Sequence, residues 1–209
     1  SYARSTQFLA TSAVVLCVSM AVFGTWVDHR ITRSVLAASG ADGTALMKGI
    51  LEQHVQRIGP DGTLHPDDVA ALDRLFVGTL LGESIVSVKL WVTDGPEKAR
   101  IIYSSMAKDT IGELHVSTDV QKAAAGQLVS EFEDMVSEES LYEQSLALPL
   151  IEIYAPLYRS GTREVLAVGE IYEDATALAQ QLREGVLLTW IVAGVTTVLM
   201  IAILYLIVL

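Results

Sequence analysis

The chain has 209 residues, of which 51% are hydrophobic, and its 14 Lys and Arg against 25 Asp and Glu give a formal net charge of -11. Such an acidic surface repels the phosphate backbone of nucleic acids, so we expect no DNA or RNA partner. The mean hydropathy of +0.43 is high for a water-soluble protein and indicates membrane segments. The single cysteine, Cys17, lies in an apolar run and has no partner for an intramolecular disulfide.

An apolar run over residues 8–27 predicts a first transmembrane helix, which follows a short cytoplasmic N-terminus, residues 1–7. About 20 helical residues cross the roughly 30 Å of hydrocarbon in a bilayer. The alternative is a cleaved signal peptide, but the apolar core is longer than a typical signal core. The nearest cleavage-like triplet, residues 36–38, lies far beyond the end of that core. The run therefore favours a retained span, with membrane lipid around it.

A second uncharged run, residues 186–209, predicts a second transmembrane helix that places both chain ends on one side of the membrane. Arg30 and Arg33 follow the first span and oppose an outer location for the middle, but long connecting domains translocate largely regardless of charge. The middle segment is acidic and free of cysteine, which suits a bacterial periplasm or cell exterior. We therefore expect an inner-membrane protein whose central domain is periplasmic or extracellular and whose chain continues beyond Leu209.

Residues 28–84 form the expected helical part of the outer domain. Apolar residues at spacings near three and four predict a first helix as far as Ile58, with Gly40 and Gly43 expected to soften it. A Gly-Pro-Asp-Gly breaker ends this helix. A second helix begins at Pro66, where proline and the two following aspartates suit a first helical turn.

The apolar pattern changes to alternation at Ile85, which predicts an antiparallel sheet over residues 85–174. Five strands are expected, over residues 85–92, 100–104, 128–132, 148–158 and 165–172. An exit helix over residues 175–185 leads into the second span. The predicted fold class is α+β: an antiparallel sheet of about five strands with a long N-terminal helix and flanking helices, between two transmembrane helices.

Several short motifs resemble PAS-like extracytoplasmic sensor domains of the PDC or single-Cache class. Residues 88–105 resemble their first hairpin, with an Asp-Gly turn and an isoleucine-rich return strand followed by Ser. Ile111-Gly112 resembles the pair that follows, and residues 153–158 and 168–171 resemble the close of that fold. The likeness covers residues 85–173 in sequence and the two spans in layout.

The resemblance implies a homodimeric bacterial transmembrane receptor, most similar to the N-terminal half of a sensor histidine kinase. A diguanylate cyclase or a chemoreceptor is the alternative output, and a two-span accessory subunit that binds a protein partner is the alternative class. A transporter is disfavoured because two spans without intramembrane charge make a poor ion path. Small residues at one-turn spacing permit close approach of helices: Ala21, Thr25, Ala193, Gly194 and Thr197.

The chain contains no catalytic constellation and no cofactor motif, and its four histidines lack metal-ligand spacing, so we expect no catalysis, cofactor or metal centre in it. A small-molecule ligand is expected on one face of the sheet. Basic and hydroxyl side chains hold carboxylates through charge-assisted hydrogen bonds. The candidates are Arg100, Tyr103, Lys108, His115, Tyr154 and Tyr158. The alternative interpretation is that the tyrosines pack the sheet and the charges are solvated.

An acidic stretch over residues 131–143 has two interpretations. Its carboxylates are suitable oxygen ligands for divalent cations. Charge runs more commonly form a solvated face. The carboxylates are Glu131, Glu133, Asp134, Glu138, Glu139 and Glu143.

Overall fold

The computed structural model describes residues 2–76, 84–133 and 141–208. The chain divides into two compact units, which we describe separately. One is a folded domain, Val35–Ala177, and the other joins Ser1–Ser34 with Leu178–Leu209. The acidic residues Asp134, Glu138 and Glu139 lie outside the described residues.

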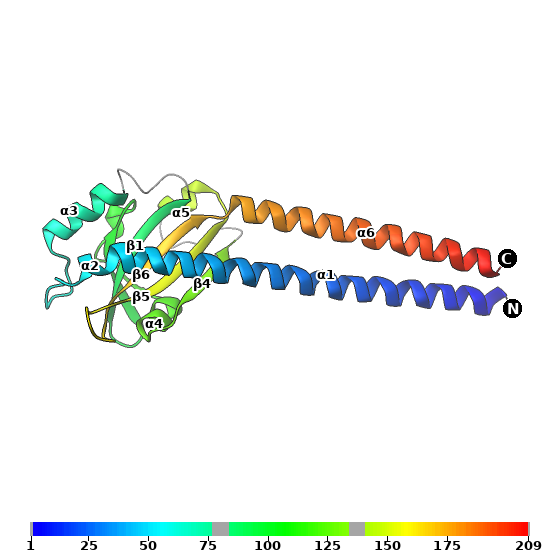
Figure 1. Cartoon of the computed structure of the whole chain (residues 1–209), viewed down its shortest axis with the longest axis horizontal. Coiled ribbons are helices and arrows are strands. Elements are labelled where there is room, and N and C mark those ends of the chain that lie inside the picture. Colours follow the sequence, from blue (N-terminus) through cyan, green and yellow to red (C-terminus); the bar gives the residue numbers. More distant parts are fainter. Residues whose placement is uncertain (1, 77–83, 134–140, 209) are drawn as a thin grey trace. The chain divides into compact units, whose positions relative to one another are not determined.

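A six-stranded antiparallel sheet forms the centre of the domain, in the order β3-β2-β1-β6-β5-β4 (Figure 1). The strands are β1 Ile85–Asp94, β2 Lys98–Ser104, β3 Leu114–Val116, β4 Val129–Glu133, β5 Leu150–Tyr158 and β6 Val165–Asp174. The α+β class and the five predicted strands are confirmed. The edge strand β3 was not expected, because three residues are too few to show an alternating pattern.

Helices precede, interrupt and follow the strands along the chain. They are α1 Tyr2–Leu46, the π-helical turn Met47–Leu51, α2 Glu52–Val55, α3 Pro66–Leu75, α4 Thr118–Ala124, α5 Leu141–Leu146 and α6 Thr176–Val208, with a 3-10 turn at Lys108–Thr110. Helix α3 begins as predicted, with Pro66 in its first turn and the His65 side chain accepting from the Asp67 N–H. Helix α5 was not expected within the acidic stretch.

Two glycines let the end of α1 lie close to one face of the sheet. The Ser130 hydroxyl of β4 donates to the Leu36 carbonyl at 3.0 Å. A Cβ atom at Gly40 would lie 3.3 Å from Ser130 Oγ, and one at Gly43 would lie 2.7 Å from Ile153 Cδ1. Both glycines lie within the continuous helix, and they remove side chains where the backbone approaches β4 and β5.

We expect Gly43→Ala to destabilise the domain by about 1 kcal/mol. A methyl group forced against Ile153 costs roughly 1–3 kcal/mol, of which about 1 kcal/mol is offset by the better helix propensity of alanine. The matched control is Gly49→Ala, because Gly49 is exposed and nothing lies within 4 Å of its added Cβ. Thermal unfolding of the full chain in detergent should separate the two variants, and equal midpoints would contradict the close packing of α1.

A buried carboxylate joins α2 to α3. Asp68 is 5% exposed and accepts from Arg57 Nε at 2.9 Å and from His54 Nδ1 at 3.1 Å. Burial opposes ionisation of Asp68, but the hydrogen bonds from Arg57 and His54 outweigh it and hold its pKa below the ordinary value.

We expect Asp68→Asn to lower the free energy of unfolding by about 1–3 kcal/mol at neutral pH, because the neutral amide keeps only one acceptor oxygen and removes the negative charge on which both bonds depend. The pKa of Asp68 is lower in the folded protein than its unfolded value of about 3.9, so the ionised carboxylate stabilises the fold above that pH. This contribution is lost as the pH falls through the folded-state pKa. The difference between wild type and variant should therefore shrink below about pH 4. Urea unfolding from pH 7 to 2.5 measures it, with the exposed Asp109→Asn as control. A difference independent of pH would contradict this account.

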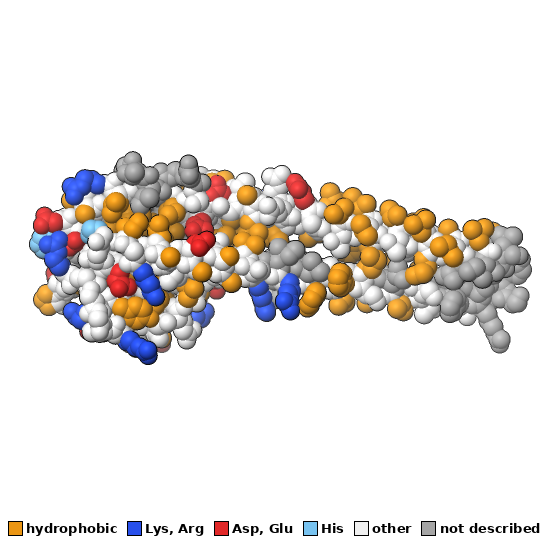
Figure 2. All heavy atoms as spheres, in the orientation of Figure 1, with side chains coloured by type: hydrophobic (Ala, Val, Ile, Leu, Met, Phe, Trp, Pro, Cys, Tyr) orange, Lys and Arg blue, Asp and Glu red, His pale blue; other side chains and the backbone are white. Residues whose placement is uncertain are grey.

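The other unit pairs the first part of α1 with α6, and its visible surface is largely hydrophobic (Figure 2). Among the described residues, one helical stretch is long and apolar enough to cross a membrane, Thr176–Ile203, with a hydropathy of 2.4. A shorter apolar stretch, Thr11–Trp26, lies in α1.

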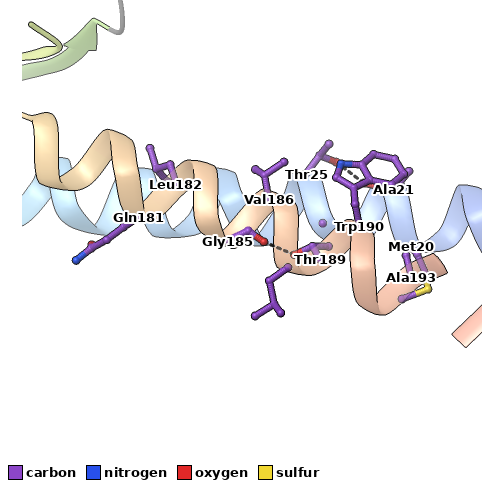
Figure 3. Close-up of a pocket in the computed structure, with 12 residues that line it drawn as sticks. Met20, Ala21, Thr25, Gln181, Leu182, Gly185, Val186, Thr189, Trp190 and Ala193 are labelled. Carbon is purple, nitrogen blue, oxygen red and sulfur yellow. Dashed lines mark hydrogen bonds between the residues drawn. The ribbon is translucent and has the colours of Figure 1, made fainter. Parts of the chain in front are cut away.

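A groove of about 420 Å³ lies between these two helices and is lined mainly by apolar and small residues (Figure 3). Gly24 approaches α6 closely, since an added Cβ would lie 2.9 Å from Thr189 Cγ2. Ala21, Thr25 and Ala193 line the same groove. Three of the small residues considered for dimer contacts thus face the groove between two helices of one chain.

Candidate functional site

Opposite the face covered by α1, the sheet carries seven buried residues that we call the polar cluster. It consists of Ser87, Lys89 and Trp91 on β1, Glu152 and Tyr154 on β5, and Glu170 and Tyr172 on β6. Each strand supplies residues two positions apart, which point to the same side of a pleated sheet. Helix α4 packs on this side through Val120 and Ala123, in one hydrophobic core with Trp91 and Tyr154.

The strand register sets six of the seven residues in two rows across β1, β6 and β5, and Trp91 lies beyond these rows, opposite Val168. In the first row Tyr172 lies opposite Ser87 on one side and Glu152 on the other. In the second row Glu170 lies opposite Lys89 and Tyr154. Lysine and glutamate are thus cross-strand neighbours in the buried centre of the sheet.

Glu170 is the centre of the hydrogen-bond network. One of its oxygens accepts from the Trp91 indole N–H at 2.6 Å, and the other accepts from the Tyr172 hydroxyl at 2.7 Å. Lys89 Nζ donates to the same Tyr172 hydroxyl at 2.9 Å and lies 4.5 Å from the centre of its ring. The tyrosine thereby links the buried ammonium to the buried carboxylate.

Tyr154 supplies a second hydroxyl to the cluster and donates to Glu152 at 2.9 Å. Burial, followed by the charges of Glu170 and Glu152, raises the pKa of Tyr154 well above its ordinary value. The phenol therefore stays protonated at physiological pH and acts as a donor toward carboxylates.

Ser87 is fully buried, and among the residues that the structure describes its hydroxyl has no hydrogen-bond partner. A buried hydroxyl left unsatisfied costs about 1–3 kcal/mol. Ser87 and Lys89 alternate along β1, so the hydroxyl lies on the face of the polar cluster. The site therefore holds one polar group with an unused capacity to donate and accept a hydrogen bond.

Of the six candidates from sequence, two lie at this site. Tyr154 belongs to the polar cluster, and the His115 ring meets the Trp91 ring edge-on at 5.7 Å between centroids. Tyr158 lies elsewhere, with Lys48 Nζ 5.9 Å from its ring centre. Its position borders an open pocket beside the end of α4.

The other three candidates are engaged in structural contacts. Arg100 donates to the carbonyl of Asp61 at 2.8 Å, in the turn that precedes α3. Tyr103 and Lys108 both bond Asp73 of α3, at 3.0 Å and 2.6 Å. Tyr103 is buried, and burial together with Asp73 raises its pKa. The six residues therefore do not converge on one site.

The charged members of the cluster were not among the residues predicted from sequence: Lys89, Glu152 and Glu170. Each stands two positions from another polar residue within an otherwise apolar strand, as in Glu152-Ile153-Tyr154 and Glu170-Ile171-Tyr172. Such repeated polar pairs were the available signal for a buried polar face. Across the described ranges, no group of three His, Cys, Asp or Glu is placed to hold a metal ion.

No family model matches the chain, and no curated protein matches its sequence. Among solved structures it is similar to the periplasmic domain of RsbU from Chlamydia trachomatis, with 14% identity and a TM-score of 0.52. This match covers 87% of the present chain and 59% of the RsbU chain. The ligand-binding domain of the Campylobacter jejuni chemoreceptor Tlp3, solved with L-valine, matches at 12% identity and a TM-score of 0.36, over 87% and 66% of the two chains. The RsbU comparison shows a shared fold.

Proposed function

We propose that the chain is the ligand-sensing and transmembrane-signalling portion of a bacterial receptor anchored in the inner membrane, with its folded domain in the periplasm or cell exterior. The polar cluster is the observation that carries this proposal. A purely structural sheet gains little from burying a lysine and two glutamates, because removing charges from water costs several kcal/mol per ion. Buried charges beside an unsatisfied hydroxyl therefore mark this face of the sheet as the candidate recognition site.

The fold supports the same assignment, since the RsbU domain that shares it is a periplasmic one. The apolar stretch Thr176–Ile203 supplies a membrane anchor, and α1 is proposed as the second span. Two spans would place both termini in the cytoplasm and the connecting domain outside. The output domain is proposed to follow Leu209, with a histidine kinase as the first candidate and a diguanylate cyclase or chemotaxis domain as the others.

Signal transfer would use the direct connection between site and span. Strand β6, which carries Glu170 and Tyr172, ends at Asp174, and α6 begins at Thr176. The Asp174 carboxylate accepts from the N–H of Thr176, the first residue of this helix, at 2.7 Å. A ligand that binds one arrangement of β6 better than another would shift α6 by an ångström or two. In a homodimer, such shifts would alter the output domains together.

Fluorescence of a single tryptophan tests the sensing function. The chain has three tryptophans, so Trp26→Phe with Trp190→Phe leaves Trp91, inside the polar cluster, as the sole emitter. The full chain in detergent would be titrated with acetate, L-alanine, ethylammonium and magnesium chloride. We expect one of them to change Trp91 emission saturably and to raise the unfolding midpoint, since ligand at 100 times its Kd adds about 2.7 kcal/mol. If neither these four compounds nor a wider set of small molecules changed the emission or the unfolding midpoint, the proposed small-molecule site would lose its support.

Membrane topology is tested with one introduced cysteine. Cys17→Ser with Glu97→Cys places a single thiol in the exposed turn after β1. A membrane-impermeant maleimide should label this thiol in intact spheroplasts. Labelling only after lysis would place the domain in the cytoplasm and contradict the proposed receptor.

A further inference from the structure

We propose that the open pocket beside the end of α4 is a second site, separate from the polar cluster, and that it binds a small carboxylate with a short apolar tail. The pocket has a volume of about 620 Å³ and lies between the end of α4 and the turn that joins β5 to β6. Ligand pockets typically have volumes of about 300–1,000 Å³. The pocket therefore has room for a small molecule, and its lining determines the kind.

The turn between β5 and β6 presents a guanidinium group to this pocket. The turn is closed by its own bonds, since the Arg159 N–H donates to the Glu164 carbonyl at 2.8 Å and the Thr162 N–H donates to the Arg159 carbonyl at 2.9 Å. The Arg159 guanidinium also donates to both carboxylate oxygens of Glu164, at 2.6 Å and 3.1 Å. Arg163 lines the pocket and has no hydrogen bond or ion pair with any residue that the structure describes. A rigid turn thus holds a cation whose donors are unused.

Tyr158 supplies a second donor to the pocket. A Cβ atom added at Gly126 would lie 3.5 Å from the Tyr158 hydroxyl oxygen, so this oxygen lies beside the last turn of α4. Within the described part of the chain, the hydroxyl has no hydrogen-bond partner. The Gln56 side chain holds the backbone here, because it donates to the Tyr158 carbonyl at 2.8 Å and accepts from the Ser160 N–H at 2.9 Å. The tyrosine is therefore fixed through its backbone while its hydroxyl stays available.

The available donors favour a carboxylate over a phosphate. The planar fork of a guanidinium matches the two oxygens of a carboxylate and forms two charge-assisted hydrogen bonds with it, and a phenol hydroxyl adds one more donor. The third polar side chain of the pocket, Thr162, is already engaged, since it donates to the Arg159 carbonyl and accepts from the Glu164 N–H. Arg163 is the one charged residue in the pocket lining, which suits an anion with a single charge.

The remaining lining sets the orientation of the ligand. Ala124 and Ala125 at the end of α4, with Val165 of β6, form the apolar part of the pocket. The carbonyl oxygens at the end of a helix disfavour an anion. The carboxylate is therefore placed at Arg163, on the side of the turn, and the tail lies against the two alanines. Each CH₂ group buried there increases affinity about fourfold.

Isothermal titration calorimetry with three probes tests this site. The full chain in a non-ionic detergent is titrated with sodium butyrate, sodium acetate and butyramide at equal ionic strength. We expect butyrate to bind saturably with a Kd roughly tenfold below that of acetate, because two further CH₂ groups are buried. Butyramide matches butyrate in length but carries no charge, and it should not bind. Equal affinity for butyrate and butyramide, or no binding of butyrate, would overturn the proposal.

Variants of the two donors place the bound butyrate. Arg163→Gln should raise its Kd about a hundredfold, the effect of two lost charge-assisted bonds, and Tyr158→Phe should raise it about tenfold. Neither should change the unfolding midpoint without ligand, because neither group has a partner among the described residues. Lys98→Gln removes an exposed cation outside the pocket and should leave the Kd unchanged. An unchanged Kd in Arg163→Gln would overturn the proposed site.

These measurements are independent of those that test the sensing function. Trp91 emission reports on the polar cluster, whereas the loss of butyrate binding in Arg163→Gln reports on this pocket. Butyrate binding that survives Arg163→Gln would belong to another site and would overturn the present inference, while the titrations of Trp91 would still decide the proposed function.

Discussion

Glu170→Ala is expected to lower the free energy of unfolding by about 3–5 kcal/mol, the loss typical of breaking a buried ion pair. Glu170 is 1% exposed and accepts from Trp91 and Tyr172. Its removal leaves the indole N–H and the tyrosine hydroxyl without their acceptor, and it leaves Lys89 buried with less negative charge nearby. Each of these costs favours the unfolded chain.

Urea unfolding of the full chain in detergent, followed by circular dichroism, measures this effect. Glu170→Gln should cost less than Glu170→Ala, because the amide keeps one acceptor oxygen of similar shape. The control is Glu164→Ala, an exposed carboxylate that pairs with Arg159 and is expected to change stability little, because solvent screens such surface pairs. If Glu170→Ala were as mild as this control, Glu170 would not be the centre of a buried network.

The interaction between Lys89 and Glu170 is isolated by a double-mutant cycle. Lys89→Met alone leaves the carboxylate without its buried cation, whereas Lys89→Met with Glu170→Leu replaces both charges by apolar groups. We expect the double variant to be more stable than the sum of the single effects predicts, by about 1–3 kcal/mol. Additive effects would show that the linking Tyr172 hydroxyl carries no coupling.

The sheet was predictable because its signal is local. Alternation in β1, the Asp-Gly turn after it and the return in β2 all lie within twenty consecutive residues. Strand β3 and helix α5 are too short for a period to be seen, and they form where neighbouring elements provide partners. The packing of Gly43 could not be predicted, because its close neighbour, Ile153, is distant in sequence.

The candidate site was largely hidden because it is assembled by non-local register. Lys89 and Tyr172 are 83 positions apart, and Trp91 and Glu170 are 79 apart. A sequence shows that polar residues alternate inside an apolar strand, but not which strands adjoin or which face is covered. Of the basic and hydroxyl residues predicted from sequence, Tyr154 belongs to the polar cluster, while Arg100, Tyr103 and Lys108 bond to the helical part of the domain.

Trp91→Ala is expected to destabilise the domain by about 3–5 kcal/mol, through the cavity left by the largest side chain of the core. Trp91 is 1% exposed and packs with Ile101, Val120 and Val168, where α4 meets the sheet. Its indole N–H also donates to Glu170 at 2.6 Å. One residue thus couples the hydrophobic packing of α4 to the polar cluster.

Trp91→Phe separates these two contributions, because it retains much of the ring volume and removes the N–H donor. We expect it to cost about 1–3 kcal/mol, chiefly from the lost bond to the carboxylate. The matched control is Trp190→Phe, at a residue that is 58% exposed on α6. Urea unfolding measures the loss of stability in the three variants. If Trp91 contributes both packing and a hydrogen bond, the loss should be largest for Trp91→Ala, smaller for Trp91→Phe and smallest for Trp190→Phe. A Trp91→Phe variant as stable as wild type would show that Trp91 acts through packing alone, and that its bond to Glu170 does not couple the polar cluster to the packing of α4.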